Sequence, residues 1–237
     1  TLYLSPSVVI KRNSEIVREG GAREVRFETT DSKSLETSIP FFKNNNLDYS
    51  EILPFSDPAV KKVVGVTLFI MMTVVVVMLL SNGVNLTDGV DGLASGSSAI
   101  VGVVLGILAY VSSHHDMAGY LNTMFIPGAE ELVIFAATLV GATAGFLWYN
   151  SYPAQVFMGD TGSLALGGII GVFAILIRKE LLLPILCGIF IAEFTSSFIQ
   201  RFYFKYSRMR TGKGVRVFKM APLHHHFQLP GGSATES

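Results

Sequence analysis

Three short polar segments carry the residues that could do chemistry, and the first of them is "NLTDGVDGLASG", from Asn85 to Gly96. It directly follows a long apolar run and contains two aspartates, Asp88 and Asp91. If a helix begins near Thr87, the two carboxylates lie on one face of a first turn that favours negative charge. A helix cap before a glycine turn is the alternative, but a cap needs only one aspartate. We therefore predict a functional role for both carboxylates.

The second segment is "NSYPAQVFMGDTGS", residues 150–163, which leads straight into another apolar run. Gly159 and Gly162 allow the backbone to approach a ligand closely. A helix that starts here offers free N–H groups to a phosphate, but Asp160 would repel a bare phosphate. Mg²⁺ held between a carboxylate and a substrate phosphate resolves this conflict, so the motif predicts a magnesium site. An aspartate that only caps the helix is an equally good explanation of this motif alone.

The third segment is "APLHHHFQ", with His224, His225 and His226. In a helix these side chains point in three directions, so at most two of them face one site. Beside phosphates, histidines can donate hydrogen bonds or move protons. Zinc binding is disfavoured because the regular spacing of zinc ligands is absent. The preceding stretch, 201–219, carries seven Lys/Arg and no acidic residue, which suits an anionic lipid or substrate but can equally reflect membrane topology alone.

The composition indicates that these motifs belong to a membrane protein. Of the 237 residues, 50% are hydrophobic and only 15% are charged, which is unusual for a soluble domain. The formal net charge of zero gives no field that would attract a nucleic acid. A single cysteine excludes a disulfide framework within the chain. The chain starts without Met or a signal peptide, and we expect it to be a piece of a longer protein.

Five apolar segments are candidates for membrane spans, each needing roughly 20 residues to cross the hydrocarbon. The fourth is marginal, with a re-entrant segment as the alternative, and we expect Arg178 and Lys179 to snorkel and lengthen it. The fifth is interrupted by Pro184 and carries Glu193, which we expect to face the bundle or a cavity. The sequence thus predicts an all-α polytopic membrane protein with about five spans, at residues 63–80, 94–112, 132–149, 164–177 and 181–200.

Successive spans place the segments between them on alternating sides of the membrane, and this puts the three motifs on the same side. If all five segments cross, residues 81–93, 150–163 and 201–237 share one side, which the basic stretch marks as cytoplasmic. Residues 63–200 then form the transmembrane region, and the polar segment 1–62 lies outside the cytoplasm. Within that segment, the alternation in "AREVRFETT" suggests a short strand or hairpin. The expected site therefore lies at the cytoplasmic membrane surface and handles a phosphate substrate.

With "IPFFKN" at residues 39–44, the three motifs resemble the phospho-N-acetylmuramoyl-pentapeptide-transferases, part of the polyprenyl-phosphate hexosamine-1-phosphate transferase family. The resemblance covers roughly residues 39–228. It implies a helical enzyme of about ten spans in the bacterial cytoplasmic membrane, with a homodimer as a further expectation. Such an enzyme transfers phospho-MurNAc-pentapeptide from its UDP-linked precursor to undecaprenyl phosphate. The products are lipid I and UMP, and the reaction uses Mg²⁺.

The resemblance also implies roles for individual residues. Asp160 would bind Mg²⁺, Asp88 and Asn150 would line the uridine site, and Phe157 would stack on uracil, with packing as the alternative because an aromatic at an interface usually packs. Asn85 and Asp91 would support the polar site, and the histidines would contact phosphate or sugar. The expected catalytic residues are therefore Asp88, Asp91, His225 and His226, and the expected substrate-binding residues are Asn85, Asn150, Phe157 and His224.

The chain departs from the family pattern in one respect. The family carries an adjacent Asp–Asp pair in an earlier cytoplasmic segment, and this sequence contains no such pair. Compared with the family pattern, we expect the first four spans and the final one to be missing from this chain, and we expect the chain alone to be inactive. Two rival functions stay open: a related transferase using another UDP-HexNAc, and an ion-coupled transporter. Coupling carboxylates of transporters lie near the membrane midplane, whereas these cluster at one interface.

Overall fold

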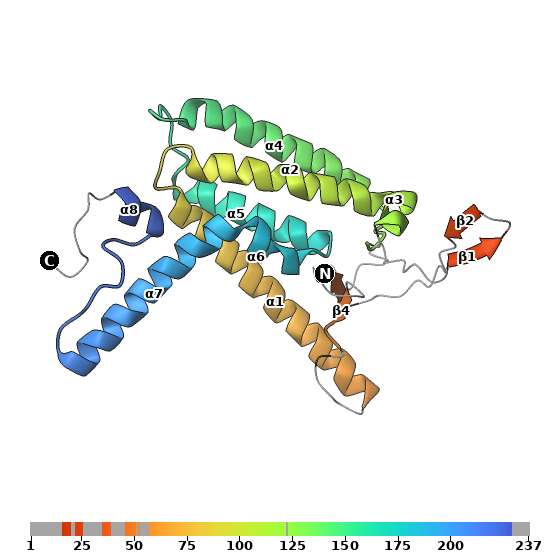
Figure 1. Ribbon diagram of the computed structural model, residues 1–237, viewed down its shortest axis with the longest axis horizontal. Helices are drawn as coiled ribbons and strands as arrows, with labels where there is room; N and C mark the ends of the chain where they lie inside the picture. The colour runs from red at the N-terminus through yellow and green to blue at the C-terminus, as the bar shows by residue number, and fades with distance from the viewer. Residues whose placement is uncertain are drawn as a thin grey trace.

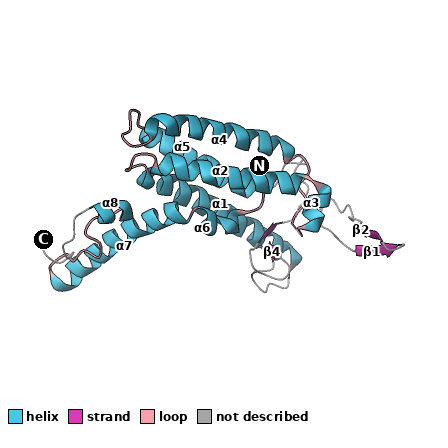
Figure 2. Cartoon of the chain, turned by 45° about the horizontal axis from the view of Figure 1, so that its top comes forward, coloured by secondary structure: helices cyan, strands magenta, loops and turns pink. Residues whose placement is uncertain are grey.

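The computed structural model describes residues 16–19, 22–25, 35–38, 46–50, 52, 57–121 and 123–228. Regular structure in these residues is almost entirely helical, and the strands are confined to the N-terminal part (Figures 1 and 2). Strand β1 (Ile16–Glu19) pairs antiparallel with β2 (Ala22–Val25), and β2 confirms the short strand or hairpin predicted at "AREVRFETT". Strand β3 (Glu36–Ser38) pairs antiparallel with β4 (Asn46–Asp48). The "IPFFKN" segment lies outside the described residues.

Four helices are long and apolar enough to cross a membrane, and a fifth crossing is possible if the bent α6–α7 pair counts as one span. The predicted helical membrane fold is thereby confirmed. The marginal fourth segment forms a continuous helix, α5. The four helices are α1 (Pro58–Thr87), α2 (Leu93–Ser113), α4 (Glu130–Asn150) and α5 (Gly159–Leu176). The remaining helices are α3 (His115–Tyr120), η1 (Glu180–Leu182), α6 (Leu183–Leu186), α7 (Gly188–Thr211) and α8 (Leu223–Gln228).

The fifth apolar segment differs from the prediction in where it breaks. Pro184 lies in the first turn of α6, where its missing N–H costs no hydrogen bond. The break comes at Cys187, between α6 and α7, and the two parts are bent by 82°. Helix α7 then continues to Thr211, beyond the predicted end at residue 200, and carries the basic residues away from the bundle (Figure 1).

Glycines bring the long helices into close contact. A Cβ on Gly167 of α5 would lie 2.7 Å from Cα of Ser81 on α1 and would collide with the carbonyl of Leu80. In the same way, a Cβ on Gly83 of α1 would lie 2.9 Å from the carbonyl oxygen of Phe190 on α7. Small residues are what membrane helices use to approach one another. These contacts bring the C-terminal end of α1 beside the start of α5 and beside α7.

The turn after α5 corrects another expectation. Arg178 and Lys179 do not snorkel, because each is only 5% exposed. The β3–β4 segment covers them and supplies polar partners. Lys179 Nζ donates to Ser38 Oγ at 2.8 Å, and the backbone N–H of Ser38 donates to the Arg178 carbonyl at 3.2 Å. The Tyr49 hydroxyl donates to Glu180 Oε1 at 3.1 Å. The β3–β4 segment therefore anchors the end of the bundle opposite the polar motifs.

Candidate active site

The three polar motifs meet at one end of the helical bundle. The loop between α1 and α2 contains Asp88 and Asp91, and the loop between α4 and α5 ends at Gly159. Both loops lie at the same end of the bundle, where the Ala154 N–H of the second donates to Asp91 of the first, and α8 lies nearby (Figure 1). The topology thus brings together residues that are more than a hundred positions apart in the sequence.

Asp88 and Asp160 form an acidic pair at the junction of α1 and α5. Burial raises the pKa of Asp88, and the neighbouring charge of Asp160 raises it further, while a hydrogen bond from the Gly159 backbone opposes both effects. Asn85 Nδ2 donates to Asp160 Oδ1 at 3.1 Å and to Ser163 Oγ at 3.0 Å. Two interacting carboxylates, one of them exposed, make a surface that favours a cation.

The donor set fits Mg²⁺ rather than a transition metal. Carboxylate oxygens are the ligands that Mg²⁺ prefers, and it usually takes one or two of them together with water and substrate phosphates. In the described part of the chain, no group of three or more His, Cys, Asp or Glu side chains could hold a metal. A cation at this pair would therefore keep open positions for phosphate oxygens.

Asp91 and Asn150 hold the two loops together in this conformation. Asp91 Oδ2 accepts a hydrogen bond from the backbone N–H of Ala154 at 3.0 Å. Asn150 is 3% exposed, and its Oδ1 accepts from the Gly92 N–H at 3.1 Å and from Ser95 Oγ at 2.9 Å. Its Nδ2 donates to the carbonyl of Val156 at 2.9 Å. Both side chains brace the site, and their predicted contacts with substrate stay predictions.

Phe157 lies in the loop between Asn150 and α5, two residues before Gly159. Its side chain is 71% exposed, which leaves an aromatic face available to a flat ligand. Asn150 fixes the preceding residue through the carbonyl of Val156. The ring is thus carried on an anchored loop beside the acidic pair, and its stacking on uracil stays a prediction.

The histidine motif packs directly on the first motif. His224 is buried, and a Cβ on Gly89 would lie 2.7 Å from its Nε2. The His225 ring lies 4.1 Å from the His224 ring, between centroids. His226 is half-buried, and its Nδ1 accepts a hydrogen bond from the Lys219 backbone at 3.2 Å. Any larger residue at position 89 would force the His224 ring to shift.

Glu193 of α7 is a site residue whose partner the sequence did not reveal. It is 5% exposed, so the expectation that it faces the interior is confirmed. Both of its oxygens accept from the His224 backbone N–H, at 3.2 and 3.3 Å, and Oε2 lies 3.2 Å from His224 Nδ1. Burial lowers the pKa of His224, and the nearby Glu193 carboxylate opposes this shift. The balance favours a neutral imidazole near pH 7.

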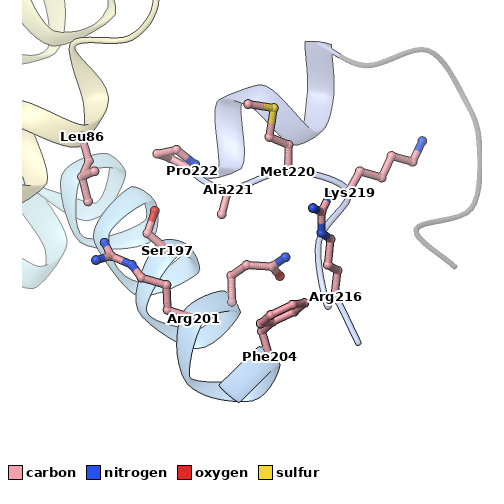
Figure 3. Close-up of a pocket in the computed structure, with 10 residues that line it drawn as sticks. Leu86, Ser197, Arg201, Phe204, Arg216, Lys219, Met220, Ala221 and Pro222 are labelled. Atoms are coloured by element: carbon pink, nitrogen blue, oxygen red, sulfur yellow. The ribbon is translucent and has the colours of Figure 1, made fainter. Parts of the chain in front are cut away.

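Two grooves flank α7. The first, of about 650 Å³, lies between α7 and the segment that returns towards the histidine motif, with Arg201, Arg216 and Lys219 in its lining (Figure 3). Gln200 holds the returning segment, because its Oε1 accepts from the N–H groups of Val217 and Phe218 at 3.0 and 2.9 Å. The second groove, of about 550 Å³, runs beside the end of α1 and is lined by Asn82, Asn85, Leu86, Phe194, Phe198, Arg201, Phe202 and Lys205.

Comparison with known proteins supplies the family. Residues 37–178 match Glycosyl transferase family 4. A phospho-N-acetylmuramoyl-pentapeptide-transferase from Porphyromonas gingivalis is 64% identical over 236 residues, covering 100% of this chain and 56% of the relative. The protein of that name from Parabacteroides distasonis is 59% identical, with the same coverage. The one from Bacteroides fragilis is 58% identical over 96% of this chain and 54% of its own length.

The chain thus spans about half the length of the curated relatives it matches. These relatives confirm the resemblance that the three motifs predicted. Together with its membrane-spanning helices, they identify a multi-pass membrane protein. Because the family match covers more than half of the sequence, the chain belongs to glycosyl transferase family 4.

Proposed function

We propose that the protein carrying this chain transfers phospho-MurNAc-pentapeptide from its UDP-linked precursor to undecaprenyl phosphate, giving lipid I and UMP. One observation carries the proposal: the first motif contacts both of the others. Asn85 donates to Asp160 of the second motif, and Gly89 packs on His224 of the third. The relatives named above bear the name of this activity, which supports the same assignment.

In this proposal Asp160 holds Mg²⁺, with Asp88 beside it and Asn85 orienting the Asp160 carboxylate through their hydrogen bond. When bound, Mg²⁺ supplies positive charge that neutralises the pyrophosphate and favours departure of UMP. Asp88, Asp91, His225 and His226 are the proposed catalytic groups. Asn85, Asn150, Phe157 and His224 are the proposed substrate-binding groups, with Phe157 stacking on the uracil ring.

The two grooves beside α7 suit the two substrates. Arg201, Arg216 and Lys219 give the first groove positive charge, which favours the carboxylates of an acidic peptide. Phenylalanines line the second groove, with Arg201 and Lys205 also in its lining. An apolar wall with nearby cations suits a polyprenyl chain that carries a phosphate. The proposed active end faces the cytoplasm, where the UDP-linked precursor is soluble.

The decisive experiment is Asp160→Asn in the full-length protein that carries these residues, assayed in membranes for Mg²⁺-dependent UMP release. We expect release to fall by at least about 100-fold, because the cation loses its protein ligand at the transferring phosphate. The amount of protein in the membrane fraction should stay unchanged. Asp116→Asn, at the exposed opposite end, serves as the control and should retain full activity.

Three results would contradict the proposal. Near-normal activity of the Asp160 variant would remove the metal assignment. Release of UMP with UDP-GlcNAc, but not with the MurNAc-pentapeptide precursor, would change the substrate. Ion-driven uptake into vesicles without any UMP release would indicate a transporter instead.

A further inference from the structure

Glu193 is a buried carboxylate to which the proposed function assigns no role. It lies in α7 at 5% exposure, within a largely apolar part of the helix. A carboxylate in such surroundings is costly unless it is paired and hydrogen-bonded. Among the described residues, every hydrogen bond and ion pair found for its side chain comes from one residue, His224. Among the described residues, the Glu193 carboxylate is therefore stabilised by contacts with a single residue, His224.

The His224 ring is enclosed on both sides. Its side chain is 7% exposed, with Nδ1 at 3.2 Å from Glu193 Oε2 and Nε2 against Gly89. The Nδ1 contact is within ion-pair distance but off the line of a hydrogen bond, so neither ring nitrogen has a hydrogen-bond partner in the described residues. Buried polar atoms without partners are uncommon and call for a functional explanation. Nε2 faces the turn that carries Asp88, where the proposed substrate binds.

We propose that Glu193 is a positioning residue for the transfer reaction, holding His224 against the Gly89 turn with the ring proton on Nδ1. A carboxylate beside one ring nitrogen favours the N–H on that nitrogen and leaves a lone pair on the other. The Nε2 lone pair, buried against the Gly89 turn, then faces the backbone of the loop that carries Asp88, so the tautomer sets how that loop is held around the bound nucleotide sugar. Burial keeps the imidazole neutral by lowering its pKa, which leaves this lone pair available near pH 7.

A purely structural brace is the competing explanation. Glu193 also joins α7 to the start of α8 through the His224 backbone N–H, and this link alone would stabilise the C-terminal segment. The negative charge of the side chain at position 193 distinguishes the two explanations. A brace needs only an acceptor for the backbone N–H, whereas control of the tautomer needs a carboxylate beside Nδ1.

The test compares Glu193→Gln and Glu193→Asp in the full-length protein, with Glu131→Gln as a control at an exposed site in the first turn of α4. Glutamine still accepts from the backbone but turns an N–H towards Nδ1, which favours the other tautomer. We expect kcat to fall about 10- to 100-fold while KM and Tm stay close to wild type. Glu193→Asp restores the charge and should recover part of kcat. The control should match wild type.

Nitrogen-15 NMR of histidine-labelled protein provides a readout that is independent of turnover, with His224 assigned by the loss of its signals in His224→Gln. We expect a proton on Nδ1 in wild type and on Nε2 in Glu193→Gln. An unchanged tautomer, or full kcat in the glutamine variant, would overturn the inference. So would losses of kcat and Tm that run in parallel without recovery in Glu193→Asp. The inference rests on the proposed function. If wild type released no UMP, that result would count against the proposed function. The NMR measurement of the His224 tautomer would still test the role of Glu193.

Discussion

Lys179 makes the stability of the protein sensitive to alkaline pH. Burial lowers the pKa of its ammonium group to about 8, with the Glu180 carboxylate opposing this shift. In the unfolded chain a lysine titrates at roughly 10.4, so between these two values the unfolded state binds more protons than the folded one. Stability therefore rises with pH across this range. We expect wild-type Tm to rise by a few degrees between pH 8 and 10, relative to Lys179→Met, in thermal unfolding followed in detergent.

The exposed Lys62, at the start of α1, provides the matched control. Lys62→Met should track wild type at every pH, because this side chain is exposed rather than buried like Lys179. A constant difference in Tm between wild type and Lys179→Met from pH 7.5 to 10 would contradict the prediction. The test is how the Tm difference between wild type and Lys179→Met changes with pH. The size of that difference at neutral pH is not a test, because the substitution also removes the hydrogen bond to Ser38.

Residue types alone predicted which side chains would gather, but not how each one is used. Asp88, Asp160 and the histidines are polar groups beside apolar runs, and the structure places them at one end. Asn150 looked the same in the sequence, yet its amide is fully engaged with Gly92, Ser95 and Val156. These partners depend on where the backbone of a second loop lies in the fold, so the spacing of residues in the sequence cannot predict them. The pairing of Glu193 with His224 was hidden for the same reason.

Among the helices, the crossing of α1 and α5 positions the acidic pair. Asn85 reaches Asp160 because Gly167 lets the two backbones approach. We expect Gly167→Ala to lower the free energy of unfolding by about 1–3 kcal/mol, because the added methyl group meets backbone atoms that cannot move away. UMP release should fall as well, since the separated helices would pull Asn85 away from Asp160. Thermal unfolding in detergent and the membrane assay measure the two effects.

The neighbouring Gly168 supplies the control within the same helix. A Cβ there meets nothing within 4 Å among the described residues, so Gly168→Ala should be tolerated and even favoured by its higher helix propensity. Equal effects of the two substitutions would show that the close crossing is not what holds α5. The two variants carry the same substitution in the same helix at nearly the same depth in the membrane. They differ only in whether the added methyl group meets α1.

Helices were easier to predict than their bends. Long apolar runs between polar segments predicted all four straight helices, because crossing hydrocarbon demands such runs. The bend at Cys187 was not predicted, since Pro184 drew attention to a position that a helix start accommodates. The direction of α7 depends instead on its contact with α1, where Gly83 meets the Phe190 backbone. Apolar patterning carries no information about that angle.

At the scale of the whole molecule, the contact between the three polar motifs determines how many times the chain crosses the membrane. The contact between Gly89 and His224 requires the segment after α7 to lie at the same end as the loops after α1 and α4. An odd number of crossings between α4 and that segment cannot satisfy this contact, whereas α5 together with the bent α6–α7 pair makes two. We therefore count the bent pair as one span, with the β3–β4 segment and residues 113–121 and 123–131 on the far side. A homodimer stays a prediction.

Cysteine labelling tests this arrangement directly. In a full-length background freed of cysteines, with Cys187→Ala in this chain, Ser151→Cys and Lys213→Cys introduce exposed thiols at the proposed cytoplasmic end. Asp116→Cys introduces one at the opposite end. A membrane-impermeant maleimide should label the first two only in inside-out vesicles and the third only in intact cells, because the reagent cannot cross hydrocarbon. Labelling of positions 151 and 213 from opposite sides would mean that the bent pair does not cross, and would separate the histidine motif from the acidic pair.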